Sequence, residues 1–175
     1  MIQCLLTGEN GAIEKIGEPC PGCWVNVVAP TEDELRRLES EVGVLGEFVR
    51  SALDEEETSR IDYDEDARQI FVIVDYPVVG EDGAGVRPQS PLQYDTMPLS
   101  MVFLPERGLF VTISLLDNEV VNDMASGRVR NVDTRLRTRF LLQMLLHISQ
   151  LYLVYLRRID RLSSNTEERL HASVR

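Results

Sequence analysis

The sequence has few of the side chains that enzymes most often use as bases, thiol nucleophiles or metal ligands. It contains only two histidines and three cysteines among 175 residues. No motif pairs a nucleophile with a base, which general acid–base and nucleophilic catalysis require. There is also no Walker A loop and no glycine-rich dinucleotide fingerprint. We therefore expect that this chain is not an enzyme.

Segments that direct a chain out of the cytoplasm or into a membrane are also lacking. The start of the chain has no basic stretch followed by an apolar run, and an odd number of cysteines fits a reducing compartment. The longest apolar run, 140–156, covers 17 residues and contains Gln143, His147, Ser149 and Gln150. A spanning helix needs about 20 mostly apolar residues. We expect a soluble chain whose last helix is buried in protein.

Positive charge is scarce in the first part of the chain. The net charge is −11, but residues 1–126 hold 25 acidic and 8 basic side chains, whereas residues 127–175 hold 4 acidic and 10 basic ones. An acidic body repels phosphates, which argues against a nucleic-acid partner. It would attract cations or the basic part of a neighbouring copy, or it serves solubility alone.

Hydrophobic patterning predicts strands first and helices later. The expected strands cover 2–7, 12–16, 23–28, 60–63, 69–76, 98–104 and 109–115. The expected helices cover 31–42, 45–53, 118–125 and a long segment from 135 to 175. The Gly/Pro/Asp-rich stretch 77–91 predicts a long loop. The fold class is α/β (α+β): a mixed β-sheet flanked by helices, with a long C-terminal helix.

The first and the last of these helices differ in their boundaries. Thr31 and Glu34 have capping-box spacing at the start of the first helix, and Gly43 ends it. The long helix has no glycine, no proline and no closing cap, and it carries more apolar surface than one small domain needs. We expect it to be part of something larger.

Three groups of side chains are candidates for chemistry. Cys20-Pro21-Gly22-Cys23 is a CxxC, but the segment after it reads as a strand, so no helix lowers the first thiol's pKa. We expect two thiols in a turn; a metal site and a redox pair are the alternatives. His147 on the apolar helix is expected to be a satisfied core residue. The carboxylates of 54–57 and 62–66 are expected to be solvated faces, although hard cations prefer such oxygen ligands.

Several segments together resemble a known family. Trp24 to Leu35 is similar to the opening motif of the CorA family of divalent-cation transporters, and Leu53 to Ile61 is similar to that family's "L-D-x-x-E-x-x-R-hydrophobic" segment. Downstream, Pro98-Leu99 opens a strand, and Phe140-Leu141-Leu142 with the stretch from Tyr152 to Leu162 resembles the first long helix after the sheet. These segments cover almost the whole chain in the family's order.

The resemblance implies an architecture. The family has a cytosolic α/β/α domain, a helical stalk and two membrane helices, the first ending in Gly-Met-Asn. Neither that signature nor the two spans occurs in this sequence. The chain thus resembles the N-terminal cytosolic domain alone, with an α/β/α sandwich over 1–133 and a truncated start of the stalk over 134–175. It would meet the membrane only through further C-terminal segments.

The resemblance also implies a function. Family members form pentamers and bind regulatory Mg²⁺ at carboxylates between subunits, which keeps the pore closed. The chain would be an ion-sensing and gating domain on the cytoplasmic face of the cell membrane, with Mg²⁺ or another divalent cation as regulator. The implied metal ligands are Glu81 and Asp82, after the buried strand, whereas a second ligand position holds Gln150 and Leu151. The alternative is a soluble oligomerising interaction module of the same fold without ion transport.

Overall fold

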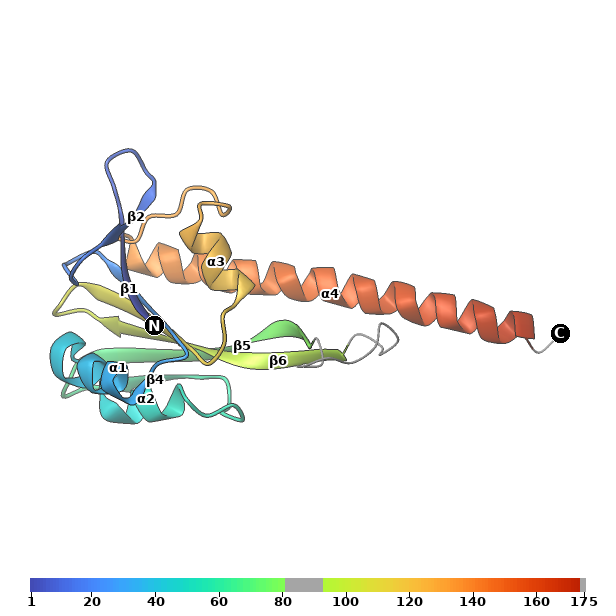
Figure 1. Cartoon of the computed structure of the whole chain (residues 1–175), viewed down its shortest axis with the longest axis horizontal. Helices are drawn as coiled ribbons and strands as arrows, with labels where there is room; N and C mark the ends of the chain where they lie inside the picture. Colours follow the sequence, from blue (N-terminus) through green and yellow to red (C-terminus); the bar gives the residue numbers. More distant parts are fainter. Residues whose placement is uncertain (81–92, 174–175) are drawn as a thin grey trace.

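The computed structural model describes residues 1–80 and 93–173 and contains one seven-stranded mixed sheet (Figure 1). The strands lie in the order β2-β1-β3-β7-β6-β5-β4. Only the central pair β3 and β7 is parallel among the described strand pairs. The strands are β1 Ile2–Thr7, β2 Ile13–Ile16, β3 Trp24–Val28, β4 Arg60–Asp64, β5 Gln69–Gly80, β6 Gln93–Leu104 and β7 Leu109–Ser114. The helices are α1 Glu32–Arg37, η1 Leu38–Val42, α2 Gly46–Ser51, α3 Glu119–Ala125 and α4 Arg137–Ser173.

Helices cover both faces of the sheet and create two cores. In Figure 1, α1 and α2 lie on one side of the strands, and α3 and α4 lie on the other. Successive strand residues point to opposite faces, so Trp24 joins Phe110 and Phe140 in the core under α4, while Val25 joins Leu38 in the core under α1 and η1. This arrangement confirms the predicted α/β/α sandwich.

The first helix begins and ends as its sequence predicts. The backbone amide of Glu34 donates to the Thr31 hydroxyl at 3.3 Å, and the amide of Thr31 donates to the Glu34 carboxylate at 2.9 Å. These two bonds form the predicted capping box. Gly43 ends the helical segment with a φ of 84°, a left-handed conformation that glycine adopts without steric cost.

The predicted loop 77–91 is wrong at its start, and its residues 81–91 lie outside the described residues. Strand β5 continues to Gly80 and pairs antiparallel with β6, so that Pro77 lies opposite Thr96 and Val79 opposite Tyr94. Strand β4 reaches only as far as Ile73 of β5, which leaves the other side of β5 open beyond that point. A proline is tolerated where a strand has an open side, because no ladder hydrogen bond is lost there.

Helix α4 has a packed part and a projecting part. Phe140, Met144, Ile148 and Leu151 recur at helical spacing and are buried against the sheet. Farther along, the helix extends away from the body of the molecule (Figure 1). By length and composition alone, Arg137–Glu167 would also be long and apolar enough to cross a membrane, a test that core helices of soluble proteins pass as well. The packed stripe shows that the first half of α4 completes the second core.

Candidate functional site at the junction of the hairpin and the long helix

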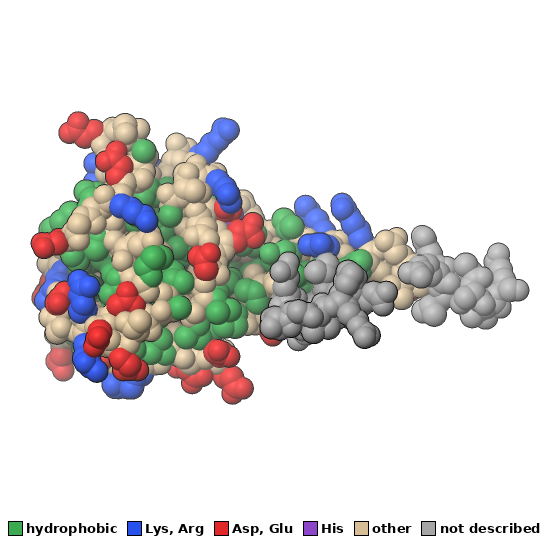
Figure 2. Space-filling view, in the orientation of Figure 1, with side chains coloured by type: hydrophobic (Ala, Val, Ile, Leu, Met, Phe, Trp, Pro, Cys, Tyr) green, Lys and Arg blue, Asp and Glu red, His purple; other side chains and the backbone are tan. Residues whose placement is uncertain are grey.

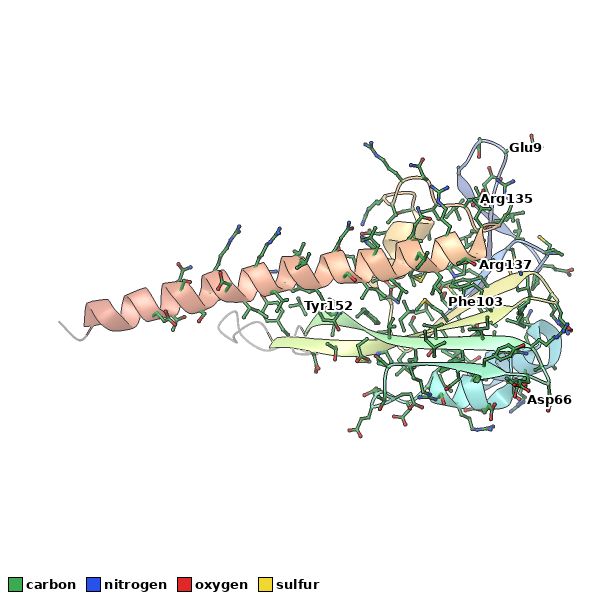
Figure 3. The ribbon with its side chains drawn as sticks, turned by 180° about the vertical axis from the view of Figure 1, so that it is seen from behind. Glu9, Asp66, Phe103, Arg135, Arg137 and Tyr152 are labelled. Carbon is green, nitrogen blue, oxygen red and sulfur yellow. The ribbon has the colours of Figure 1, made fainter. Side chains whose placement is uncertain are left out.

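The described part of the β5–β6 pair lies along α4, and three tyrosines take part in the contact. The rings of Tyr94 and Tyr155 are tilted against each other, with centroids 5.9 Å apart. The hydroxyl of Tyr152 donates to the backbone carbonyl of Asp75 at 3.3 Å. Figure 3 shows Tyr152 reaching from α4 towards the strands. We call Tyr94, Tyr152 and Tyr155 the tyrosine junction.

The carboxylates of Asp75 and Glu119 lie near the tyrosine junction. The hydroxyl of Tyr155 donates to Glu119 at the start of α3, over 3.4 Å. Burial raises the pKa of both Tyr152 and Tyr155, and the negative charges of Asp75 and Glu119 raise them further. The junction is therefore a partly buried, electronegative contact between the hairpin, α3 and α4.

The predicted metal ligands Glu81 and Asp82 lie outside the described residues. Their position in the chain follows Gly80, which pairs with Gln93 at the last described rung of the hairpin. In the described part of the chain, no three His, Cys, Asp or Glu side chains are grouped so that they could hold a metal ion. The divalent-cation site therefore stays a prediction.

The second ligand position of the resemblance does not contribute a carboxylate. Gln150 is exposed on α4, and Leu151 packs into the core with 8% of its surface exposed. Leu151 thus serves the contact between α4 and the sheet. The neighbouring Tyr152 is the residue of this stretch that reaches the hairpin.

The acidic residues near β4 form local hydrogen bonds and ion pairs. Arg60 pairs with both Glu57 and Asp62. Asp64 accepts a 2.6 Å hydrogen bond from the amide of Ala67 in the β4–β5 turn. These contacts fit the expected solvated acidic face.

The thiols and His147 lie on different sides of the fold. Cys4 and Cys23 are buried and Cys20 is partly buried, and all three are reduced. Burial raises the pKa of Cys23 to about 11, the opposite of what an activated thiol needs. His147 contacts Asp123 across the α3–α4 interface, with its Nε2 3.0 Å from the carboxylate. It is therefore a satisfied interior residue, as the sequence predicts.

Helix α4 exposes large apolar side chains along both its packed and its projecting part, and basic side chains along its projecting part. Seven large apolar side chains of this helix are 40–59% exposed: Leu142, Leu146, Leu153, Val154, Leu156, Ile159 and Leu162. Arg157, Arg158 and Arg161 are exposed on the same part of the helix. Figure 2 shows carboxylates and basic side chains interspersed over the body of the molecule, and basic side chains along the helix that leaves it. Exposed apolar surface is frequent at contact sites.

Sequence reasoning missed the contact between Tyr94 and Tyr155. Tyr94 lies in a segment that was expected to precede the strand, and no local pattern relates it to a helix residue 61 positions later. The pairing of β6 with β5 is what places Tyr94 beside α4.

Known proteins match this chain in structure. No protein-family model matches it, and the comparison with curated proteins finds no match. The complete CorA magnesium transporter from Methanocaldococcus jannaschii matches with a TM-score of 0.76 and 20% identity, over 98% of this chain and 51% of that one. The soluble domain of the same CorA matches with a TM-score of 0.76 and 20% identity, over 98% and 65%. The ZntB cytoplasmic domain from Vibrio parahaemolyticus matches with a TM-score of 0.66 and 11% identity, over 91% and 62%.

The matches include the long helix as well as the sheet, because they extend over nearly the whole chain. The chain spans about half the length of the complete CorA, with 51% of it covered. The arrangement expected from the motifs is thus confirmed at the level of the fold. This chain has the fold of the soluble domain of CorA and of the cytoplasmic domain of ZntB.

Proposed function

We propose that this chain is the cytosolic regulatory domain of a CorA-like transporter of Mg²⁺ or another divalent cation. The observation that carries the proposal is the fold match over 98% of the chain, which includes a helix projecting from the body. In this role the domain lies on the cytoplasmic face of the cell membrane and catalyses no reaction. Transport is left to the part of the transporter that this chain does not cover.

Ion sensing is assigned to Glu81 and Asp82, which follow strand β5 in the chain. Hard divalent cations prefer oxygen ligands such as carboxylates. Glu81 and Asp82 come directly after β5, and the partner strand β6 carries Tyr94 of the tyrosine junction. With the cation bound, facing acidic surfaces of neighbouring subunits are neutralised. When the cation leaves, the carboxylates repel each other, and α4 transmits the movement away from the body.

Assembly is assigned to α4. Seven of its large apolar side chains are exposed in a single copy of the chain, and the acidic body and the basic helix are of opposite charge. Both features favour association of copies, as a pentamer in the proposed transporter. The same exposed apolar side chains support the second candidate function, a soluble oligomerising interaction module without ion transport.

Thermal unfolding with added MgCl₂ tests ion sensing. A cation that binds only the folded chain raises the melting temperature. We expect the double substitution Glu81→Gln and Asp82→Asn to abolish this rise. The matched control is Glu55→Gln with Glu56→Gln, which removes the same charge from an exposed acidic run. Equal shifts in both variants, or with NaCl at the same ionic strength, would show charge screening in place of a site.

Sedimentation velocity separates the two candidate functions. The regulatory domain should associate differently with and without millimolar Mg²⁺, because the cation bridges acidic surfaces. The interaction module should associate to the same extent under both conditions and show no magnesium-dependent melting temperature. Uptake of Mg²⁺ by cells expressing the complete reading frame then tests transport directly.

A further inference from the structure

The proposed function leaves the Cys20-Pro21-Gly22-Cys23 turn without a role. The amide of Cys23 donates to the carbonyl of Cys20 at 3.0 Å, and Gly22 has a φ of 89°. A proline at the second position of a turn and a positive φ at the third, here Pro21 and Gly22, are the features of a type II turn. A β-turn holds the Cα atoms of its first and fourth residues within about 7 Å, the range that a disulfide spans.

The two thiols of this turn differ in access. Cys20 is partly exposed, whereas Cys23 is completely buried. Burial is the main reason that the pKa of Cys23 rises to about 11; a backbone hydrogen bond to Cys20 lowers it, and the neighbouring thiols of Cys4 and Cys20 raise it. Since the thiolate is the reactive form, Cys20 is the thiol that attacks first and Cys23 the one that follows.

The third thiol is near the turn but does not complete a metal site. Cys4 on β1 lies opposite Val25, two residues beyond Cys23 on the same face of the sheet, which makes Cys4 a diagonal neighbour of Cys23. Within residues 1–80 and 93–173, no three His, Cys, Asp or Glu side chains are arranged to hold a metal. The geometry therefore favours a reaction between two thiols.

We infer that Cys20 and Cys23 form a reversible dithiol–disulfide site that reacts with low-molecular-weight disulfides. The Cys20 thiolate attacks one sulfur of the small disulfide, forms a mixed disulfide and releases one small thiol. Cys23 then attacks the Cys20 sulfur and releases the second small thiol. Two cysteine thiols are oxidised, one external disulfide is reduced, and their two protons end on the released thiols. The bridge closes a very short loop, so it adds little stability and is readily reduced.

The surroundings of the turn provide a spectroscopic reporter. The amide of Gly22 donates to the carbonyl of Gly108 at 2.8 Å, and a Cβ on Gly22 would lie 3.1 Å from Cγ of Arg135, just ahead of α4. The turn is thus packed between the β6–β7 turn and the start of α4. Trp24 directly follows Cys23 and is the only tryptophan of the sequence. Its emission therefore reports a change of the turn.

Oxidation in glutathione disulfide, followed by alkylation of free thiols and mass spectrometry, tests the site. We expect a link between Cys20 and Cys23 in both the wild-type chain and the Cys4→Ser variant. The wild-type chain should then retain one alkylatable thiol, and the variant should retain none. Trp24 emission should change and return after dithiothreitol. The Cys20→Ser variant should form no Cys20-linked bridge and show no such emission change.

Three results would overturn the inference. They are a mixed disulfide that persists on Cys20, a bridge that involves Cys4, and complete resistance of the folded chain to excess glutathione disulfide. Disulfide mapping of the wild-type chain gives the answer even if a serine variant does not fold. Circular dichroism on each variant establishes that the compared proteins are folded.

Discussion

Asp123 of α3 connects two elements that are far apart in the sequence: its carboxylate lies 3.0 Å from Nε2 of His147 on α4. The same carboxylate accepts a 2.6 Å hydrogen bond from Arg128 in the segment between the helices. Asp123 is 8% exposed, so its charge is held in the interior by these two partners. It ties α3 and the following segment to the helix that projects from the domain.

Replacing this carboxylate should weaken the domain. We expect Asp123→Asn to lower the free energy of unfolding by about 1.5–3 kcal/mol, the range for hydrogen bonds to charged groups. Urea unfolding followed by circular dichroism measures the change. Asp160→Asn on the exposed part of α4 is the matched control and should stay within about 0.5 kcal/mol. Equal losses in the two variants would contradict a specific role for Asp123.

A buried hydrogen-bonded chain crosses the parallel strand pair. The indole nitrogen of Trp24 donates to the Thr112 hydroxyl at 2.7 Å, and that hydroxyl donates to the Asn26 side-chain oxygen at 2.9 Å. Thr112→Val keeps the shape but leaves both partners unpaired, each at a cost of about 1–3 kcal/mol. We expect a total loss of about 2–6 kcal/mol in guanidinium unfolding. Thr96→Val, at an exposed strand position, should have little effect.

Tyr76 should make the domain sensitive to alkaline pH. Burial, and to a lesser extent the charge of Asp117, raises its pKa from 10.0 to about 12. The folded state thus favours the neutral hydroxyl, so this contribution to stability is complete below pH 10.0 and is lost as pH rises towards 12. Unfolding curves recorded between these pH values should show a smaller loss for Tyr76→Phe than for the wild-type chain.

The same variant has a second expected property at neutral pH. Among the described residues, the buried Tyr76 hydroxyl has no hydrogen-bond partner. Removing it should leave stability unchanged or raise it by up to about 1 kcal/mol, since no bond is broken. Tyr63→Phe, at a site that is 57% exposed, is the control and should not alter the alkaline loss. A neutral-pH loss above 1 kcal/mol in Tyr76→Phe would reveal a bound partner of the hydroxyl.

The two sides of α4 should respond differently to truncation. Met144 is completely buried, so Met144→Ala should cost about 2–5 kcal/mol. Leu146 is 58% exposed, so Leu146→Ala should cost less than about 0.5 kcal/mol in the isolated chain. Leu146→Ala should instead weaken self-association in sedimentation experiments. If Leu146→Ala leaves association unchanged, the exposed apolar side of α4 is not the contact.

Local signals were sufficient wherever the physics is local. The capping box of Thr31 and Glu34 depends on residues three positions apart, and the end of the helix at Gly43 depends on one backbone angle. The β-branched run predicts strand β3, and the helical pattern of apolar residues predicts the long helix. These features follow from hydrogen bonds and steric limits within a few residues, which any sequence window contains.

The extent of the β5–β6 hairpin could not be derived in this way. The composition around Pro77 indicates a loop, and only pairing with Thr96 and its neighbours makes the segment a strand. That pairing joins two separate segments of the chain, and nothing in their spacing along the sequence indicates that they pair. The candidate site shares this property, because Tyr94 and Tyr155 meet only once the hairpin has formed.

The sequence by itself determined the element order, the α/β/α class, the helix caps and the resemblance to CorA, because each rests on local periodicity or on ordered motifs. The tertiary structure decided which side of α4 is buried, why His147 is satisfied by Asp123, and how Cys4 comes to lie near Cys23. These relations depend on register and packing between distant segments. Burial depends on what covers a side chain, and no residue pattern along one helix specifies its partner.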